Sequence, residues 1–293
     1  MKLTPLAKAL LFLIGLGLVG TAIYKFVPKD KLPWNRPKAA PSADGSTTSE
    51  TSTTAPSNDG SSSAQTSTSA STSKEPWIEI PGGIFSSGQN QESVDVSTFK
   101  IGRTEVTNGE YEAFLAQCAA GSSCGPREAP NYWDDEAYLD SHRNNPVVFV
   151  SWGDAKAYCK WAGGRLPTIA EWEKAARGTD GREFPTGATI DPASVNILGA
   201  DHDKKDSAAK KIPTWAVDDE KYGRDASPYG VLGMAGNVSE WTSTNSPDEP
   251  DNYLAAGGSW DSWDLNDGRT HFRIGKSPTD RSSSLGFRCA QSK

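Results

Sequence analysis

Hydrophobic residues are distributed along this chain in two separate regions, with a long polar stretch between them. Residues 9–24 form an uninterrupted apolar run, ALLFLIGLGLVGTAIY, without a charged side chain. Residues 41–74 consist mostly of Ser, Thr, Ala, Gly and Asp, which offer too little apolar surface to offset the entropy lost on folding. Short apolar runs return at Trp77. The pattern predicts a short N-terminal tail (1–8), a membrane-spanning segment (9–27), a disordered Ser/Thr-rich linker (28–75) and one globular domain (76–291).

The first apolar run is bracketed by Lys8 and Lys25. It is shorter than the span of about 20 residues that a bilayer requires, but flanking lysines can extend their stems to the membrane surface. A cleaved signal peptide is the alternative. No small-x-small cleavage site follows, because Tyr24, Lys25 and Phe26 come next. We therefore expect an uncleaved signal anchor.

The orientation of this anchor depends on two opposing indications. A count of basic residues favours a cytoplasmic C-terminal side, because Lys25, Lys29, Lys31, Arg36 and Lys38 all follow the span. The very short N-terminal tail and the even number of cysteines favour the opposite orientation. We expect a single-pass membrane protein whose C-terminal domain is extracytoplasmic, in the periplasm or at the cell surface.

The globular region opens with a strand at 77–80 and a turn at Pro81-Gly82-Gly83, and a further strand ends at Val106. Three capping boxes then mark helix starts, at 107–110, 151–154 and 168–171. The helices are predicted to run to about Gln117, to Trp161 and to Gly178. The remaining sequence is rich in Gly, Pro and Asn and has only short apolar runs. This predicts an α+β domain with low regular content.

Charge and histidine content exclude several functions. The net charge is −7 and the basic residues are scattered, so nucleic-acid binding is not expected. The chain contains three His, and no nucleophile elbow is visible for Ser-His-Asp catalysis.

Three segments carry a family resemblance: GGRLPTIAEWEKAARG (163–178), GMAGNVSEWTS (233–243), and the pair GGS (257–259) and GFRC (286–289). Together they resemble the formylglycine-generating enzyme family, also called the sulfatase-modifying factor family. The resemblance implies a variant of the C-type lectin-like fold, preceded here by one transmembrane helix. Within these motifs Trp172, Trp241, Arg165 and Arg288 are interpreted as fold determinants, the two arginines bonding loop carbonyls.

The family's reactive thiols are missing from this chain. In the catalysts of the family, two cysteines follow the GGS motif, and counting without gaps places Ser262 and Asp267 at their positions. No cysteine lies between Ser259 and Arg288. A hydroxyl cannot replace the soft thiolate that binds copper(I) in these enzymes, so copper is not expected. No catalytic residue is therefore assigned.

The four cysteines are Cys118, Cys124, Cys159 and Cys289, which allow three disulfide pairings. Cys118 and Cys124 bracket a short loop that closes easily. The resemblance implies a bond between Cys159 and Cys289, because these match positions that are linked in family members. We predict both disulfides. A redox dithiol is the alternative, but the chain has no C-x-x-C motif.

The resemblance also implies calcium as a possible cofactor. The family's GN-x-EW loop supplies carbonyl oxygens and a carboxylate, which fall on Gly236, Val238 and Glu240, while the family's amide ligand is replaced by Gly233. A second site would use Asn196, Ile197 and an aspartate that could be Asp201, Asp203 or Asp206. The alternative is that Asn196 and Glu240 satisfy loop backbone groups.

Three functions compete. We favour a membrane-anchored, extracytoplasmic, sulfatase-modifying-factor-like domain that is not catalytic and binds a protein, peptide or glycan. Aromatic and Arg side chains commonly anchor recognition. The predicted binding groove consists of Ser259, Trp260, Trp263, His271, Phe272 and Arg273. One alternative is an oxidoreductase of the formylglycine-generating type with an atypical active site. The other is a structural subunit of a cell-envelope assembly.

Overall fold

The computed structural model describes residues 76–119, 128–134, 136–197, 213–219 and 221–293. The predicted anchor and linker, and the aspartates at 201, 203 and 206, lie outside the described residues. Within the described residues, no helix has the length and apolar character needed to cross a membrane.

Three small antiparallel or mixed sheets organise the domain. The first contains β1 (Trp77–Ile80), β4 (Phe99–Gly102) and β9 (Ala290–Ser292), in the order β1-β4-β9. The hairpin of β2 (Gly83–Ser87) and β3 (Glu92–Val96) forms the second. The third has the order β7-β6-β5-β8, with strands Arg273–Lys276, Tyr253–Ala256, Ser239–Asn245 and Leu285–Gly286. The first and last strands of the domain therefore share one sheet, in which both pair with β4.

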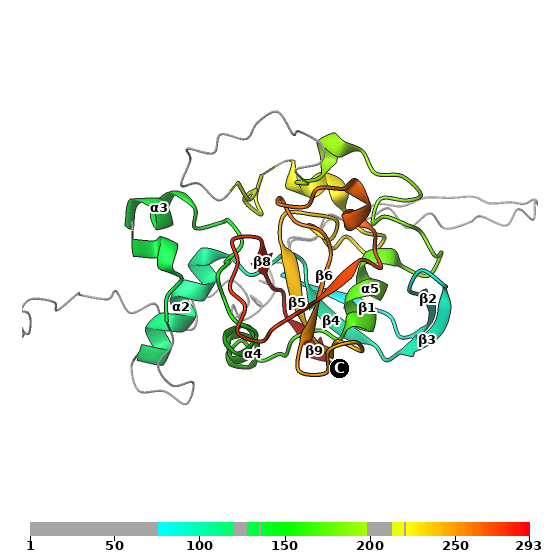
Figure 1. Ribbon diagram of the computed structural model, residues 1–293, viewed down its shortest axis with the longest axis horizontal. Helices are drawn as coiled ribbons and strands as arrows, with labels where there is room; N and C mark the ends of the chain where they lie inside the picture. The colour runs from blue at the N-terminus through cyan, green and yellow to red at the C-terminus, as the bar shows by residue number, and fades with distance from the viewer. Residues whose placement is uncertain (1–75, 120–127, 135, 198–212, 220) are drawn as a thin grey trace, which may run out of the picture.

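The α-helices of the described residues lie around these sheets: α2 (Asn108–Ala119), α3 (Glu136–Ser141), α4 (Trp152–Trp161) and α5 (Ile169–Arg177). In Figure 1, α2, α3 and α4 lie on one side of the β5–β6 pair, and α5 lies on the other side with the β2–β3 hairpin. Short 3-10 turns occupy Asn131–Asp134 (η2), Pro192–Ser194 (η3), Tyr222–Asp225 (η6) and Leu265–Gly268 (η7). The α+β content predicted from the sequence is confirmed.

All three predicted capping boxes are present. Thr107 Oγ1 accepts from the Glu110 N–H, and Glu110 accepts from the Thr107 N–H in return. Ser151 with Asp154 and Thr168 with Glu171 make the same exchange at α4 and α5. One strand boundary was wrong: β4 ends at Gly102 rather than at Val106. The Val106 N–H instead bonds the Phe287 carbonyl, because the chain there crosses to the GFRC segment.

The core has two main parts. Tyr111, Phe114, Tyr158, Trp241 and Phe287 lie in one, packed between α2, α4 and the β5–β8 region. Ile80, Phe99, Ile101, Trp172 and Met234 lie in the other, beneath α5. Trp172 and Trp241 are 1% and 0% exposed, as their interpretation as fold determinants requires.

A disulfide joins Cys159 on α4 to Cys289 beside β9, across a sequence separation of 130. This is the pairing that the family resemblance implied. Cys118 is also disulfide-bonded, and its predicted partner Cys124 lies outside the described residues.

Candidate functional site

A surface cleft of about 280 Å³ lies beside the segment that follows the GGS motif. It is bounded by β7, by the segment that follows the GGS motif, and by the loop before β8. Its lining residues are Ser239, Ser259, Asp261, Ser262, Trp263, Asp264, Asp267, Phe272, Ile274, Lys276, Ser282, Ser284 and Leu285.

Three of the six predicted groove residues line this cleft: Ser259, Trp263 and Phe272. Trp260 is not among them, and its indole N–H donates to the Ser283 carbonyl at 2.9 Å. His271 and Arg273 also lie elsewhere. Arg273 lies on β7 between Phe272 and Ile274, which face the cleft, so the alternation of side chains turns it away. His271 lies in the turn before this strand.

Ser262 and Asp267, the residues that counting from the GGS motif assigns to the family's thiol positions, both line the cleft. The Ser259 N–H donates to Ser262 Oγ at 3.1 Å. Burial raises the pKa of Asp267, and a hydrogen bond from Ser262 opposes that shift. Counting from the GGS motif therefore selected two residues that lie in the same cleft. A hydroxyl bonded to a carboxylate can hold polar ligand groups, but it supplies neither a thiolate nor a second redox partner.

The cleft combines negative charge with exposed apolar surface. Asp261, Asp264 and Asp267 line it, and Lys276 is the one basic side chain among its described lining residues. Asp264 accepts from the Asn266 backbone N–H, and this bond lowers its pKa. Trp263 and Ile274 are 61% and 44% exposed and belong to the few large hydrophobic residues exposed in the described chain.

His271 and Arg273 belong to a different cluster, behind the cleft. Arg177 donates to His271 Nδ1 at 2.9 Å, and burial together with this guanidinium lowers the pKa of the His271 imidazole. Arg273 lies 3.8 Å from Glu173. Glu173 is 1% exposed and accepts from Ser87 Oγ and the Gly88 N–H, both at 2.7 Å. The cluster attaches the β2–β3 hairpin to α5.

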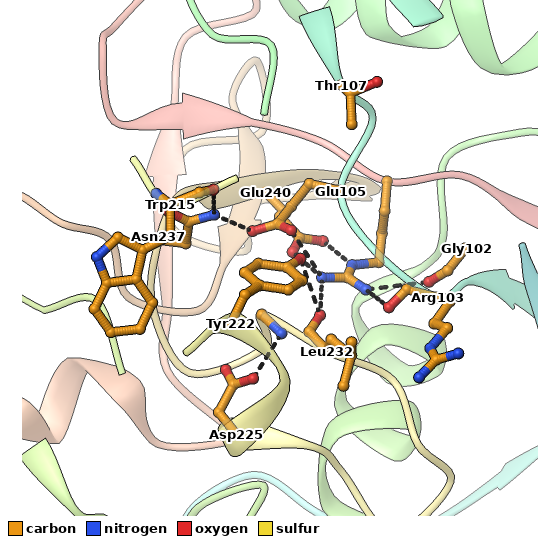
Figure 2. Close-up of polar contacts among 12 residues, drawn as sticks. Gly102, Arg103, Glu105, Thr107, Trp215, Tyr222, Asp225, Leu232, Asn237 and Glu240 are labelled. Atoms are coloured by element: carbon orange, nitrogen blue, oxygen red, sulfur yellow. Dashed lines mark hydrogen bonds and ion pairs between the residues drawn. The ribbon is translucent and has the colours of Figure 1, made fainter. Parts of the chain in front are cut away.

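A buried polar cluster lies at the predicted calcium position (Figure 2). Arg288, 0% exposed, donates from Nε and Nη2 to the two oxygens of Glu240, at 2.6 and 2.7 Å. The Trp172 indole N–H donates to the same carboxylate at 2.8 Å. As predicted, Arg288 also bonds loop carbonyls, those of Gly102, Arg103 and Leu232. Arg165, by contrast, bonds mainly Glu171 and only one carbonyl, that of Leu166.

Two further carboxyl groups are buried beside this ion pair. Glu105 is 1% exposed; its Oε1 accepts from Asn237 at 3.2 Å, while its Oε2 lies 4.0 Å from Arg288 and has no hydrogen-bond partner among the described residues. Burial raises the pKa of Glu105 well above its usual value. Burial also raises the pKa of Asp225 to about 6, against a hydrogen bond from the Gly233 N–H. The Arg288 guanidinium is thus the positive charge that interacts with three buried carboxyl groups, those of Glu105, Asp225 and Glu240.

This arrangement does not fit a calcium ion at Glu240, because both oxygens of that carboxylate are bonded to Arg288 and Trp172. The Asn196 carbonyl accepts from the Asn237 N–H at 2.9 Å, and a Cβ on Gly236 would lie 2.7 Å from that carbonyl oxygen. Ile197 and Val238 are buried. The two predicted ligand loops therefore pack directly against each other. In the described ranges, no group of three or more His, Cys, Asp or Glu residues is placed to hold a metal ion.

Sequence reasoning missed several residues of both sites. Asp261, Asp264, Ile274 and Lys276 lie within the segment that the motifs singled out, and the alternation around Phe272 could have found the last two. Glu105 and Asp225 gave no local signal, because their burial depends on contacts with distant segments.

The fold and the cleft define a class of mixed α/β domains related to the formylglycine-generating enzymes. The family model described as "Sulfatase-modifying factor enzyme 1-like domain" matches residues 62–293. The chain therefore belongs to this family.

Curated relatives include proteins with different names. The chain is 41% identical over 159 residues to "Inactive C-alpha-formylglycine-generating enzyme 2" of Mus musculus, covering 50% of this chain and 49% of that protein. It is 33% identical over 211 residues to "Uncharacterized protein YfmG" of Bacillus subtilis (strain 168), covering 58% of this chain and 42% of the relative. The match to "Formylglycine-generating enzyme" of Streptomyces coelicolor is 37% over 281 residues and covers 73% and 88%. The chain thus spans about half or less of the first two relatives.

Solved structures support the fold alone. The crystal structure of CarF matches with a TM-score of 0.54 and 22% identity, over 74% of this chain and 97% of that one. Treponema denticola variable protein 1 matches with a TM-score of 0.55 and 22% identity, over 73% and 94%.

Proposed function

We propose that this chain is a non-catalytic member of its family, a membrane-anchored extracytoplasmic domain whose cleft binds a protein, peptide or glycan. The observation that carries the proposal is that Ser262 and Asp267, the positions to which the resemblance assigns the family's thiols, both line the cleft. The chain has four cysteines, and none lies between Ser259 and Arg288. Within the described residues no cysteine is free.

The names of the relatives do not decide whether this chain is catalytic. One relative is named an inactive formylglycine-generating enzyme, and another is named a formylglycine-generating enzyme. Overall identity does not separate them, since the two values are 41% and 37%. The side chains in the cleft therefore carry more weight than the degree of similarity.

The membrane anchor and compartment rest on the apolar run within 9–27 and on the cysteines. A disulfide such as Cys159–Cys289 persists in oxidising compartments and is rare in the cytosol. The disulfide therefore favours an extracytoplasmic location for the domain. Calcium at Asn196 and Ile197, with an aspartate from the segment that follows, stays a proposal for the same domain.

The direct experiment measures turnover. The full chain, purified in detergent, is incubated with copper(I), oxygen and a sulfatase-type cysteine peptide, and formylglycine is sought by mass spectrometry. The Streptomyces coelicolor relative is the positive control. We expect no product from this chain. Clear turnover would refute the proposal and favour the oxidoreductase alternative.

Metal analysis of the purified protein gives an independent measurement. Stoichiometric copper or iron would support an enzyme, whereas calcium alone would be compatible with a binding domain. Recovery of one stoichiometric partner from membranes would favour the third function, a structural subunit.

A further inference from the structure

Arg177 joins the β2–β3 hairpin to the turn that precedes β7. Its side chain is 1% exposed, and its Nη1 donates to the Ser86 and Gly88 carbonyls of the hairpin, at 2.8 and 3.0 Å. On the other side, its Nε donates to Thr270 Oγ1 at 2.8 Å, and its Nη2 lies 2.9 Å from His271 Nδ1. A single buried guanidinium therefore holds two segments that are far apart in the sequence.

The turn that carries His271 leads directly into the cleft. Phe272 lines the cleft, and its carbonyl accepts from the Gly257 N–H of the GGS motif at 3.1 Å. The Thr270 N–H donates to the Glu183 carbonyl at 2.8 Å. His271 is half-buried between these two anchored neighbours. A change in its contact with Arg177 therefore acts on the backbone next to the cleft wall.

The contact between Arg177 and His271 requires a neutral imidazole. A guanidinium has only donors, so His271 Nδ1 has to be the acceptor and the imidazole proton has to lie on Nε2. Both nitrogens of a protonated imidazole are donors, so the hydrogen bond is lost on protonation. The buried guanidinium would then face a second positive charge and would lack one of its partners. The donor and acceptor chemistry by itself makes this contact sensitive to acid.

The groups around His271 oppose its protonation on balance. Burial lowers the pKa of the imidazole most, and the guanidinium groups of Arg177 and Arg269 lower it further, while Glu183 and Glu173 raise it. Glu173 is already paired with Arg177 at 3.1 Å. The Glu183 side chain is 43% exposed, and solvent and salt therefore screen its charge. His271 is thus neutral at neutral pH and keeps its bond to Arg177.

We propose that the contact between His271 Nδ1 and Arg177 Nη2 is an acid-sensitive latch between the β2–β3 hairpin and the wall of the cleft. While the imidazole is neutral, the latch is closed and Arg177 holds the turn before β7 against α5. Protonation opens the latch, loosens the hairpin and the turn together, and increases the mobility of the backbone at Phe272. The inference goes beyond the proposed binding function, because it concerns the motion of the cleft wall and holds for any ligand.

The latch opens as the pH falls. Because the pKa of His271 is lowered in the closed state, the released imidazole binds a proton more readily than the closed one. The closed state therefore loses stability as the pH falls below about 6.5, the ordinary pKa of histidine. Above that pH the imidazole is neutral in both states, and the stability of the latch does not change with pH.

NMR measures the protonation state directly. The full chain is labelled with ¹⁵N-histidine and purified in detergent, and the signals of His271 are those lost in His271→Asn. We expect a proton on Nε2 and none on Nδ1 at neutral pH, and titration below the ordinary value of about 6.5. A proton on Nδ1 at neutral pH, or titration at or above that value, would overturn the proposal.

Amide hydrogen exchange measures the opening. The variant His271→Asn keeps an oxygen acceptor for Arg177 near the position of Nδ1 but cannot be protonated. Comparing the two proteins at the same pH cancels the intrinsic pH dependence of exchange. We expect residues 83–96 and 269–276 to exchange several-fold faster in the natural protein than in the variant at about pH 5, and equally fast at about pH 7.5.

Two further variants distinguish the latch from a general loss of structure. His271→Lys carries a positive charge at both pH values, so the hairpin should exchange fast at neutral pH as well. His142→Asn is the matched control, because His142 is also half-buried but contacts Tyr138 and not Arg177. It should follow the natural protein throughout.

Two results of the exchange experiment would reduce His271 to a structural contact. One is a difference between the natural protein and His271→Asn that is the same at both pH values. The other is an acceleration at acid pH that is as large in β5 and β6 as in the hairpin. Neither result bears on the non-catalytic proposal, which is tested by turnover of a cysteine peptide.

Discussion

At the scale of single residues, buried charge distinguishes the interior of this domain. Three carboxyl groups, those of Glu105, Asp225 and Glu240, surround Arg288, and each is 4% exposed or less. Only Glu240 has a close bidentate bond to the guanidinium. The other two therefore lose hydration without gaining full compensation, and their protonation becomes linked to folding.

Asp225 makes this linkage measurable. Its pKa is raised from 3.8 to about 6 by burial, so the folded protein binds a proton that the unfolded chain releases. Between these two pKa values stability falls as pH rises, by about 3 kcal/mol for a shift of two units. Asp225→Asn keeps an acceptor for the Gly233 N–H but cannot ionise. Relative to the variant, the natural protein should lose stability between about pH 4 and about pH 6.

Urea unfolding followed by tryptophan fluorescence measures this difference at each pH. Glu105, whose pKa is also raised mainly by burial, is present in both proteins; the Asp225 charge is the smallest of the causes of its shift, so the comparison removes most of its contribution. Asp248→Asn is the control and should follow the natural protein throughout. A stability difference that does not change with pH would contradict the burial-based interpretation of Asp225.

At the residue scale, the sequence indicated which segment lines the cleft but not which of its side chains face it. Ser262 and Asp267 could be placed by counting from the GGS motif, and the structure brings them into one cleft. His271 and Arg273 do not line the cleft, because Arg273 alternates with its neighbours on β7 and His271 lies in the turn before that strand. Their neighbour Phe272 faces the cleft and they face α5. Side-chain alternation was the physical information that the motif comparison left out.

At the scale of secondary-structure elements, local signals predicted the helices well. Each capping box satisfies its own helix terminus with residues three positions apart, so nothing distant is needed to recognise it. The β2–β3 hairpin, by contrast, is held in place by contacts with residues that are distant in the sequence. It belongs to no larger sheet, and α5 holds it through Glu173, Lys174 and Arg177, which bond to Ser87, Gly83 and Ser86. These contacts span 86 to 91 residues and have no local sequence signature.

Glu173→Gln tests this attachment. The substitution keeps one carbonyl acceptor but removes the charge opposite Arg177, which lies 3.1 Å away and is equally buried. Breaking a buried ion pair on one side typically costs about 3 kcal/mol or more. We expect amide hydrogen exchange to accelerate first in the hairpin, Gly83–Val96, and less in β5 and β6. Mass spectrometry of exchanged peptides locates the change.

The control for this variant is Glu79→Gln, which removes an exposed pair with Lys293. Exposed pairs contribute about 1 kcal/mol or less, so exchange in the hairpin should stay unchanged. Uniform acceleration across the domain in Glu173→Gln, without an early response of the hairpin, would show that Glu173 stabilises the fold globally and does not specifically attach β2 and β3.

At the scale of the whole molecule, segments far apart in sequence build both the site and the core. The buried cluster joins residues from four parts of the chain: Glu105 after β4, Asp225 in η6, Glu240 in β5 and Arg288 between β8 and β9. The family resemblance could predict the architecture, because its motifs are fixed parts of that architecture. It could not predict which carboxylates pair with Arg288, since the partner at each position depends on the particular side chains that surround it in this chain.

The Cys159–Cys289 disulfide links two parts of the molecule that are far apart in the sequence. It connects α4, which packs in one part of the core, to the segment that leads into β9, in the sheet beneath the other part. Because it closes a loop with a separation of 130, it restricts the unfolded chain strongly. The chain-entropy model assigns about 5 kcal/mol to a loop of this size, as an upper value.

The double variant Cys159→Ala with Cys289→Ala should therefore unfold on the order of 10 °C below the natural protein, given about 2–4 °C per kcal/mol for a domain of this size. Thermal unfolding followed by near-ultraviolet circular dichroism measures the difference. The double change is needed because a single change would leave a reactive thiol near the core. Unchanged thermal stability would mean that packing around α4 and β9 stabilises the fold without the disulfide.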